Sequence, residues 1–329
     1  MLDNKTILVT GGTGSFGQKF VKTILKKYKK VKKIIIFSRD ELKQHEMSQE
    51  INDKNYKSVR YFIGDVRDKE RLYKAFKDVD IVIHAAALKQ VPTSEYNPSE
   101  TIKTNILGTQ NVIDACIDNN VNKLVSLSTD KASSPVNLYG ATKLCADKLV
   151  VGSQNTKGNI NYKACVVRYG NVLGSRGSVL PVFIKQKENK LFLITSKEMT
   201  RFNILLDEGI DLVLWSLKNC RGGEIFVPKI PSYKVLDLAK AIDPKCKIKF
   251  IGIRAGEKIH EEMISVSEGY NTIDLGKYYS IIPSFSNYSI DKYIKKFGGK
   301  RVRNKFSYNS FENKNYLSVK QLKKLIVKV

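Results

Sequence analysis

The sequence predicts an α/β protein built on a doubly wound parallel sheet. Short apolar runs such as residues 34–37 and 81–84 alternate with amphipathic helical patterns through the first half of the chain. Strands without polar positions are typical of a sheet that helices cover on both faces. The length of 329 residues allows about two structural units. We therefore expect a smaller C-terminal portion to follow the sheet.

The elements follow one another as successive βα units. Strands are expected at residues 5–10, 34–37, 59–63, 81–84, 123–127 and 164–168, and helices at 15–28, 70–77, 100–119 and 208–218. After residue 172 this rhythm breaks, and glycines and prolines cluster at 174–181, 222–231 and 252–256. We expect residues 1–172, completed by parts of 205–243, to form the sheet domain, and residues 173–204 and 244–329 to form the C-terminal portion.

Composition excludes several classes of protein. With 42% apolar and 27% charged residues, the chain is neither disordered nor fibrous. No run approaches the roughly 18 apolar residues of a membrane span, and no secretory leader is recognisable. Five cysteines show neither CxxC nor metal-ligand spacing. We expect a cytoplasmic protein with reduced thiols and no metal site.

The net charge of +25 raises the question of a nucleic-acid partner. Lysines, however, are scattered at the polar positions of amphipathic stretches, and the densest run, residues 26–33, falls at the end of the first expected helix. Nucleic-acid-binding motifs are not recognisable in the sequence. We expect no nucleic acid and no membrane as partners. A positive field would instead attract an anionic nucleotide.

A glycine-rich loop joins the first expected strand to the first helix. It reads Thr-Gly-x-x-Gly-x-x-Gly, the order in which a tight turn, a close backbone approach and a helix N-terminus together hold a dinucleotide pyrophosphate. Because the loop joins a strand to a helix at the start of alternating βα units, it predicts a Rossmann-type domain. The expected cofactor-binding residues of this loop are Gly11, Thr13, Gly14, Ser15, Phe16 and Gly17.

The end of the second strand bears on which dinucleotide binds. An acid there would hold the ribose 2′-hydroxyl of NAD, whereas an arginine can pair with the 2′-phosphate of NADP. Arg39 precedes Asp40, and we favour NADP, with Ser38 and Lys43 as additional cofactor-binding residues. Further along the sheet, Asp65 and Val66 are placed to border the adenine, and Ala85, Ala86 and Ala87 would allow a close approach by a cofactor ribose.

Tyr139 and Lys143 stand four residues apart, on one face of the helix after the fifth strand. A tyrosine with a pKa near 10 is a poor base at neutral pH. A neighbouring ammonium, helped by a positive nicotinamide, would stabilise its phenolate. This is the layout of the extended short-chain dehydrogenases/reductases.

Asp130 and Lys131 directly follow the fifth strand, beside the expected nicotinamide. Hydride transfer with one base, as in a dehydrogenase or epimerase, has no use for this pair. An elimination needs both a base for a carbon acid and an acid for a departing hydroxyl. The pair therefore favours a dehydratase.

The run at 127–144 resembles the inverting UDP-N-acetylglucosamine 4,6-dehydratases, which begin pseudaminic acid synthesis. Further blocks of similarity lie at residues 38–44, 64–68, 84–90, 168–172, 175–179, 199–202, 226–232 and 251–258. The resemblance implies NADP as cofactor, UDP-N-acetylglucosamine as substrate and a homo-oligomer, a hexamer in the family. It adds Val172 to the cofactor site, and Lys89, Asn171, Val179, Arg201, Arg254 and Glu257 to the substrate site.

The resemblance also implies a role for each catalytic residue. Tyr139 would act as base for oxidation at C4, Asp130 would protonate the leaving C6 hydroxyl, and Lys131 would remove or return the C5 proton. The alternatives are a retaining dehydratase, a 4-epimerase, and a non-catalytic NADP- or nucleic-acid-binding protein. Tyr139 favours inversion over retention, and the complete set of four residues favours an enzyme.

Overall fold

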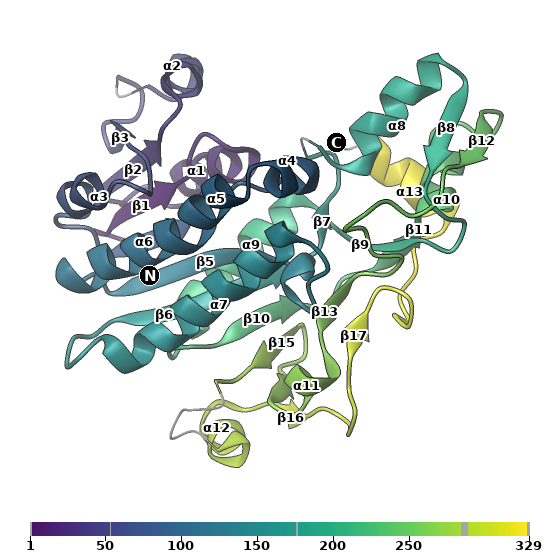
Figure 1. The fold of residues 1–329 in the computed structure, drawn as a ribbon. Helices are drawn as coiled ribbons and strands as arrows, with labels where there is room; N and C mark the ends of the chain where they lie inside the picture. Colours follow the sequence, from purple (N-terminus) through teal and green to yellow (C-terminus); the bar gives the residue numbers. More distant parts are fainter. Residues whose placement is uncertain (1, 53, 176, 284–288, 328–329) are drawn as a thin grey trace.

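The computed structural model describes residues 2–52, 54–175, 177–283 and 289–327. A ten-stranded sheet with helices on both faces forms its centre (Figure 1). The strand order is β16-β14-β15-β10-β6-β5-β4-β1-β2-β3, and the strands from β10 to β3 pair in parallel. Strand order reverses between β1 and β4, which is where such sheets bind ligands. The predicted Rossmann-type α/β fold is confirmed.

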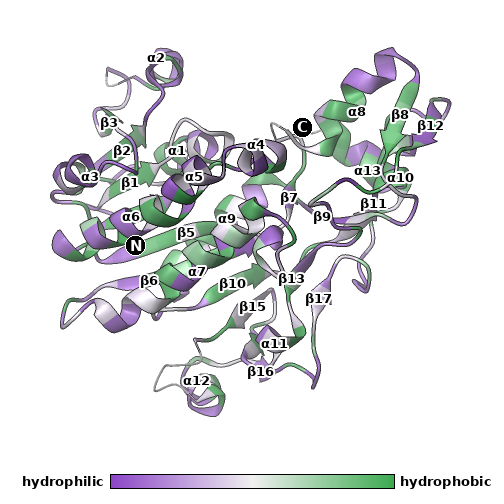
Figure 2. Cartoon of the chain, viewed as in Figure 1, coloured by the Kyte–Doolittle hydropathy of each residue, from purple (hydrophilic) through white to green (hydrophobic). Residues whose placement is uncertain are grey.

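The expected strands of the first half are all present, within one or two residues at each end. The parallel strands are β1 (Thr6–Thr10), β2 (Lys33–Ser38), β3 (Val59–Ile63), β4 (Ile81–His84), β5 (Lys123–Thr129), β6 (Lys163–Tyr169) and β10 (Ile225–Pro228). The helices around them are α1 (Ser15–Lys27), α2 (Glu41–Glu50), α3 (Lys69–Ala75), α4 (Val91–Tyr96), α5 (Pro98–Ile102), α6 (Gly108–Asp118), α7 (Leu138–Thr156) and α9 (Leu206–Asn219). Figure 2 shows hydrophobic central strands and hydrophilic outer helices such as α2 and α3.

The expected continuous helix at 100–119 is interrupted. A π-helical turn, Lys103–Leu107, separates α5 from α6. This turn places Asn105 against the segment after β4, where its side chain accepts a hydrogen bond from the Leu88 amide and donates to the Leu88 carbonyl and to Thr142. Such single π turns are frequent at functional sites. Hydrophobic periodicity did not reveal it, because the turn displaces the pattern by only one residue.

Part of the C-terminal half forms a second layer beside the sheet (Figure 1). Its apolar core includes Leu180, Phe183, Phe192 and Leu238. The elements around this core are β7 (Asn171–Val172), α8 (Val179–Glu188), β8 (Leu191–Ile194), β9 (Thr200–Ile204), β11 (Ser232–Lys234), α10 (Val235–Ile242), β12 (Lys247–Phe250) and α13 (Val319–Ile326).

The main sheet extends into residues that the sequence assigned to the C-terminal portion. β14 (Thr272–Asp274), β15 (Tyr278–Ile281) and β16 (Lys300–Arg301) continue it beyond β10 in antiparallel fashion. Conversely, β11 and α10, expected to complete the sheet domain, pack in the second core. The chain therefore passes between the main sheet and the second core more often than the expected boundaries imply. Strands that come late in the sequence extend the sheet beyond β10.

Three observations concern other kinds of site. No helix within the described ranges is long and apolar enough to cross a membrane. Among the same residues, no group of three or more His, Cys, Asp or Glu side chains is arranged to hold a metal ion. The five cysteines are free thiols, and four of them, Cys145 being the exception, are buried.

Candidate active site

The glycine loop lies against the loop that follows β4. Gly11 has φ +64°, and a Cβ there would stand 2.8 Å from the backbone nitrogen of Ala86. A Cβ on Gly17 would collide with the backbone of Gly12. The Thr10 hydroxyl accepts hydrogen bonds from the amides of Ala85 and Ala86, at 3.2 and 3.3 Å. A side chain on Gly11 is therefore excluded where the two loops meet.

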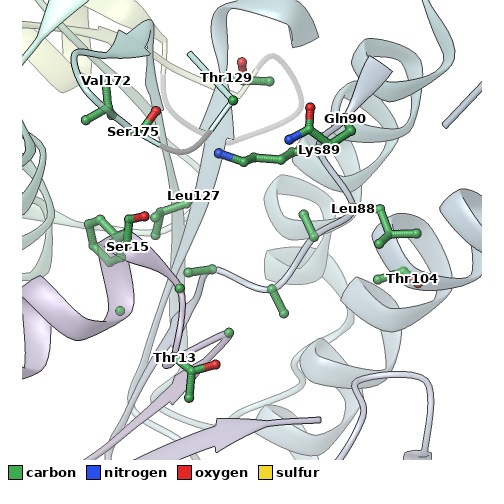
Figure 3. Close-up of a pocket in the computed structure, with 18 of the residues that line it drawn as sticks. Thr13, Ser15, Leu88, Lys89, Gln90, Thr104, Leu127, Thr129, Val172 and Ser175 are labelled. Carbon is green, nitrogen blue, oxygen red and sulfur yellow. The ribbon is translucent and has the colours of Figure 1, made fainter. Parts of the chain in front are cut away.

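These loops border a cleft of about 560 Å³. Figure 3 shows Lys89 extending from the loop after β4 across this cleft, toward Val172 and Ser175. Every residue that the sequence assigned to the cofactor lines it, as do Lys131 and two of the predicted substrate residues. The predicted residues in its lining are Gly11, Thr13, Gly14, Ser15, Phe16, Gly17, Ser38, Arg39, Asp40, Lys43, Asp65, Val66, Ala85, Ala86, Ala87, Lys89, Lys131, Tyr139, Lys143, Asn171 and Val172.

At the β2 end of the cleft, the carboxylate of Asp40 already has partners within the protein. Asp40 caps helix α2 by accepting a hydrogen bond from the Lys43 amide at 3.0 Å, and it also pairs with the Lys43 ammonium. These hydrogen bonds hold the pKa of Asp40 below its usual value. The Arg39 side chain is about half exposed and lies 3.8 Å from Asp65. Ser38 is hydrogen-bonded to Thr13 at 2.8 Å.

Asp130 and Lys131 lie in a 3₁₀ turn at the end of β5, where Lys131 lines the cleft. Lys131 Nζ is 3.1 Å from Asp130 Oδ1 and 3.4 Å from Asn171 Oδ1. Asp130 is fully buried, and its Oδ2 has no hydrogen-bond partner among the described residues. Burial raises the pKa of the Asp130 carboxyl, although the nearby Lys131 opposes this. Asp130 therefore lies below the cleft surface, and Lys131 lines it.

Glu261, which no sequence motif indicated, joins this pair. It immediately precedes β13 (Glu262–Ile264), and its Oε1 is 3.1 Å from Lys131 Nζ and 3.6 Å from Arg201 Nε. Burial alone would raise the pKa of Glu261, but Lys131 and Arg201 hold it below the usual value. Burial also disfavours the Lys131 ammonium, but Asp130 and Glu261 outweigh burial and raise the pKa of Lys131. Only the tertiary structure reveals Glu261, because it follows Asp130 by over a hundred residues.

Tyr139 and Lys143 occupy the first turns of α7, whose N-cap is Asn137. Burial raises the pKa of Tyr139 to about 12, and the Lys131 ammonium opposes that rise. Lys143 instead faces Asp147, and burial lowers the pKa of Lys143. The Lys131 ammonium thus favours the Tyr139 phenolate, and the role that the sequence pattern gives to Lys143 stays a prediction.

The remaining predicted substrate residues lie beside the cleft and not in its lining. Glu257 links two of them, being 3.8 Å from Arg201 and 3.6 Å from the exposed Arg254. The Arg201 guanidinium is anchored by the carbonyls of residues 200, 258 and 259. Val179 begins α8. Cleft-lining residues that the sequence analysis did not single out include Leu88, Gln90, Tyr169, Ser175 and Ser178.

A Rossmann sheet with this glycine loop, a Tyr-x-x-x-Lys helix and a polar strand end defines an extended short-chain dehydrogenase/reductase. The chain belongs to the polysaccharide biosynthesis protein family, whose model matches residues 7–283. It is 53% identical to a UDP-N-acetylglucosamine 4,6-dehydratase (inverting) of Campylobacter jejuni subsp. jejuni, over 99% of this chain and 98% of that relative. The family resemblance drawn from the sequence is thereby confirmed.

Other relatives carry different names. A UDP-glucose 4-epimerase of Rickettsia bellii is 43% identical, over 99% of this chain and 96% of that protein. The solved structure of Pen from Bacillus thuringiensis is 36% identical, with a TM-score of 0.90 over 100% of this chain and 98% of that one. A dTDP-glucose 4,6-dehydratase of Streptomyces venezuelae, solved with NAD and TYD bound, shares the fold at 22% identity, with a TM-score of 0.68 over 77% and 86% of the two chains.

His84, at the end of β4, is a structural residue whose titration should be visible in stability. Its ring is hydrogen-bonded to Thr10 at 2.8 Å and to Thr109 at 3.1 Å. Burial, with a contribution from Lys143, lowers the pKa of His84 to about 3. As pH falls below 6.5 the unfolded chain takes up this proton first, so stability is lost toward pH 3. We expect a loss of about 2 kcal/mol between about pH 6.5 and pH 5.

Urea unfolding of the wild type and of His84→Gln across this pH range measures the contribution. The variant should have a flatter dependence on pH, whereas His45→Gln, on the exposed face of α2, should follow the wild type. Equal acid sensitivity in the wild type and His84→Gln would show that His84 is not the titrating group.

Proposed function

We propose that this protein is an NADP-dependent UDP-N-acetylglucosamine 4,6-dehydratase that inverts C5, a hydro-lyase. The buried Asp130–Lys131 pair beside Tyr139 carries the proposal, since it supplies an acid and a second titratable group where a dinucleotide-binding cleft would hold a sugar. The Campylobacter relative of that name supports the substrate. Its product would be a 4-keto-6-deoxy sugar nucleotide, the first intermediate of pseudaminic acid synthesis.

The residues of the cleft fit a nicotinamide dinucleotide. Gly11 and Gly17 leave a cradle that side chains would fill, at the N-terminus of α1. At its other end, Asp40 is committed to capping α2, while Arg39, Ser38 and Lys43 remain near the same position. This arrangement favours a 2′-phosphate over a free 2′-hydroxyl, and thus NADP. When bound, the nicotinamide supplies reversible hydride transfer to and from the sugar.

Three side chains would handle the protons. Tyr139 accepts the proton of the C4 hydroxyl during oxidation, and the resulting ketone acidifies C5. Asp130 protonates the departing C6 hydroxyl, a role that fits a buried carboxyl with a raised pKa. Lys131 removes or returns the C5 proton. Lys143 completes the site from the next turn of α7.

We propose two groups of substrate contacts. Lys89 and Asn171, which line the cleft, would contact the sugar side. Val179, Arg201, Arg254 and Glu257 would border the substrate from the C-terminal layer, where the exposed guanidinium of Arg254 can pair with the diphosphate. The nucleotide domain would then comprise residues 1–172 with α9, β10 and β14 to β16, and the substrate portion would comprise residues 173–204, β11, α10 and the rest of 244–329. We further propose a homo-oligomer, a hexamer by family resemblance, in the cytoplasm.

A second candidate function, UDP-sugar 4-epimerisation, is favoured by the Rickettsia relative. That reaction needs oxidation and reduction at C4 alone. It would give Asp130 no catalytic role. Incubation with UDP-N-acetylglucosamine and no added cofactor, followed by NMR, separates the two reactions. We expect a 4-keto-6-deoxy product. Formation of the 4-epimer, with the C6 hydroxyl retained, would contradict the dehydratase proposal.

Cofactor preference is tested at Arg39. Denaturation of the purified protein should release NADP, and Arg39→Ala should weaken the binding of NADP far more than that of NAD, because only NADP carries the 2′-phosphate. Calorimetric titration of cofactor-free protein with both dinucleotides measures the difference. Recovery of mostly NAD, or equal weakening of both, would contradict the assignment.

Two further variants separate oxidation from elimination. Tyr139→Phe removes the phenolic base and should leave the nucleotide sugar unchanged while the cofactor still binds. Asp130→Asn should slow loss of the C6 hydroxyl by ~10²–10⁴-fold, the usual contribution of a positioned acid. Single-turnover NMR follows both steps. Full activity of Asp130→Asn would remove Asp130 from the mechanism.

A further inference from the structure

Glu261 lies at the proposed reaction centre although it is not part of any motif found in the sequence. Its side chain is 3% exposed, and its Oε2 has no hydrogen-bond partner among the described residues. A buried carboxylate is costly unless charges compensate it. Here the compensation comes from Lys131 at 3.1 Å and Arg201 at 3.6 Å.

The backbone of Glu261 is fixed from a distant segment. Its amide donates to the hydroxyl of the buried Ser310 at 2.9 Å, and the Ser310 amide donates to its carbonyl at 2.7 Å. The Ser310 hydroxyl is also 2.7 Å from that of Thr200, in β9. Glu261 is therefore held in place by main-chain contacts that do not depend on Lys131, so its carboxylate is available to orient Lys131.

Lys131 has three acceptors for its three N–H groups. They are Asp130 Oδ1 at 3.1 Å, Glu261 Oε1 at 3.1 Å and Asn171 Oδ1 at 3.4 Å. This set matches an ammonium and not a neutral amine. To accept a proton from C5, Lys131 must first give one up. The nearest recipient that the mechanism can use is Asp130 Oδ1.

That transfer would prepare both catalytic groups in one step. The Lys131 N–H bond breaks and an O–H bond forms on Asp130, so that the ammonium and the carboxylate become a neutral amine and a carboxylic acid. The amine can take the C5 proton, and the acid can protonate the departing C6 hydroxyl. The pair can do this only while it still holds the shared proton.

We propose that Glu261 is a positioning residue that orients Lys131 against Asp130 and retains the proton which this pair shares. The inference rests on the proposed function and adds a residue to it. The negative charge of Glu261 stabilises the ammonium directly. It also disfavours a second negative charge on Asp130, so that a proton moving between the two groups is not lost to solvent.

Several charged or titratable groups face Lys131 from the surrounding elements. They are Asp130, Tyr139, Arg201, Tyr233, Lys258 and Glu261. Only Asp130 and Glu261 among these stabilise the ammonium as neighbouring carboxylates, while Arg201 and Lys258 oppose it. Without Glu261, Asp130 would be the only carboxylate left to balance Arg201 and Lys258. The Asp130–Lys131 pair should therefore lose its shared proton at a lower pH.

The chemical reactivity of Lys131 tests this without substrate, because acetic anhydride acetylates only the neutral amine. Peptide mass spectrometry after a brief exposure at constant pH should show Lys131 acetylated about tenfold or more faster in Glu261→Gln than in the wild type, the effect of at least one pKa unit from a neighbouring charge. Lys148, exposed on α7, serves as the internal reference. Glu262→Gln is the matched control, since Glu262 instead accepts hydrogen bonds from Ser133 and Ser134. An unchanged Lys131 rate in Glu261→Gln would overturn the proposal.

Kinetics then tests the positioning role. Glu261→Gln should lower kcat by about 10–100-fold, less than loss of a direct proton donor, and should move the alkaline loss of kcat at least about one pH unit lower. A change in KM alone would overturn the proposal, since it would mean that Glu261 acts through Arg201 on substrate binding. If Glu261→Gln fails to fold, Glu261→Asp replaces it. The shorter carboxylate keeps the charge, so kcat should fall while the alkaline limb stays, and an unchanged kcat would be contradictory.

The proposed function and this inference fail differently. A wild-type enzyme that does not dehydrate UDP-N-acetylglucosamine would refute the function, and the acetylation rates would still decide whether Glu261 retains the proton. A dehydratase with unchanged Lys131 reactivity in Glu261→Gln would refute the inference alone.

Discussion

Four charged side chains that meet beyond the end of β5 constrain the rest of the site; all but Lys131, which lines the cleft, are buried. Asp130, Lys131, Glu261 and Arg201 alternate in sign over contacts of 3.1 to 3.6 Å. Breaking a buried ion pair by removing one partner is far more destabilising than losing a surface pair. These residues therefore have to be supplied together, from β5, β9 and the segment before β13, which ties the C-terminal layer to the sheet.

The same arrangement explains how a fold used for simple hydride transfer can support an elimination. The glycine loop, the alanines after β4 and the first turns of α7 build a cleft suited to a dinucleotide and a tyrosine base. The buried carboxylate below that cleft, with the lysine at its surface, adds the two further proton positions that loss of water requires. Burial raises the pKa of the Asp130 carboxyl, while the neighbouring Lys131 ammonium opposes this rise.

Local patterns predicted the sheet, and every residue that they assigned to a cofactor lines the cleft. The strand-loop-helix order around Gly11 and the apolar strands around 34–37 and 81–84 depend on residues close in sequence, and such patterns can be read from one chain. Asp130, Lys131 and Tyr139 were found for the same reason, since they follow one strand within ten residues.

Long-range contacts set the limits of that prediction. Glu261 gains its role only because Ser310 and β9 hold it against Lys131, and no spacing in the sequence reports this. The charge next to Lys143 is that of Asp147, one turn further along α7, whose carboxylate accepts hydrogen bonds from Ser128 and Arg168. The π turn at Asn105 and the addition of β14 to β16 to the sheet likewise depend on tertiary packing.

The most direct test of the account is the configuration at C5 in the first product formed. UDP-N-acetylglucosamine is incubated with the enzyme in deuterium oxide, and NMR spectra are recorded at the earliest times, before the 4-keto sugar can epimerise in solution. The proposed inverting dehydratase predicts the L-arabino product with deuterium from solvent at C5. An early product with the D-xylo configuration would contradict inversion.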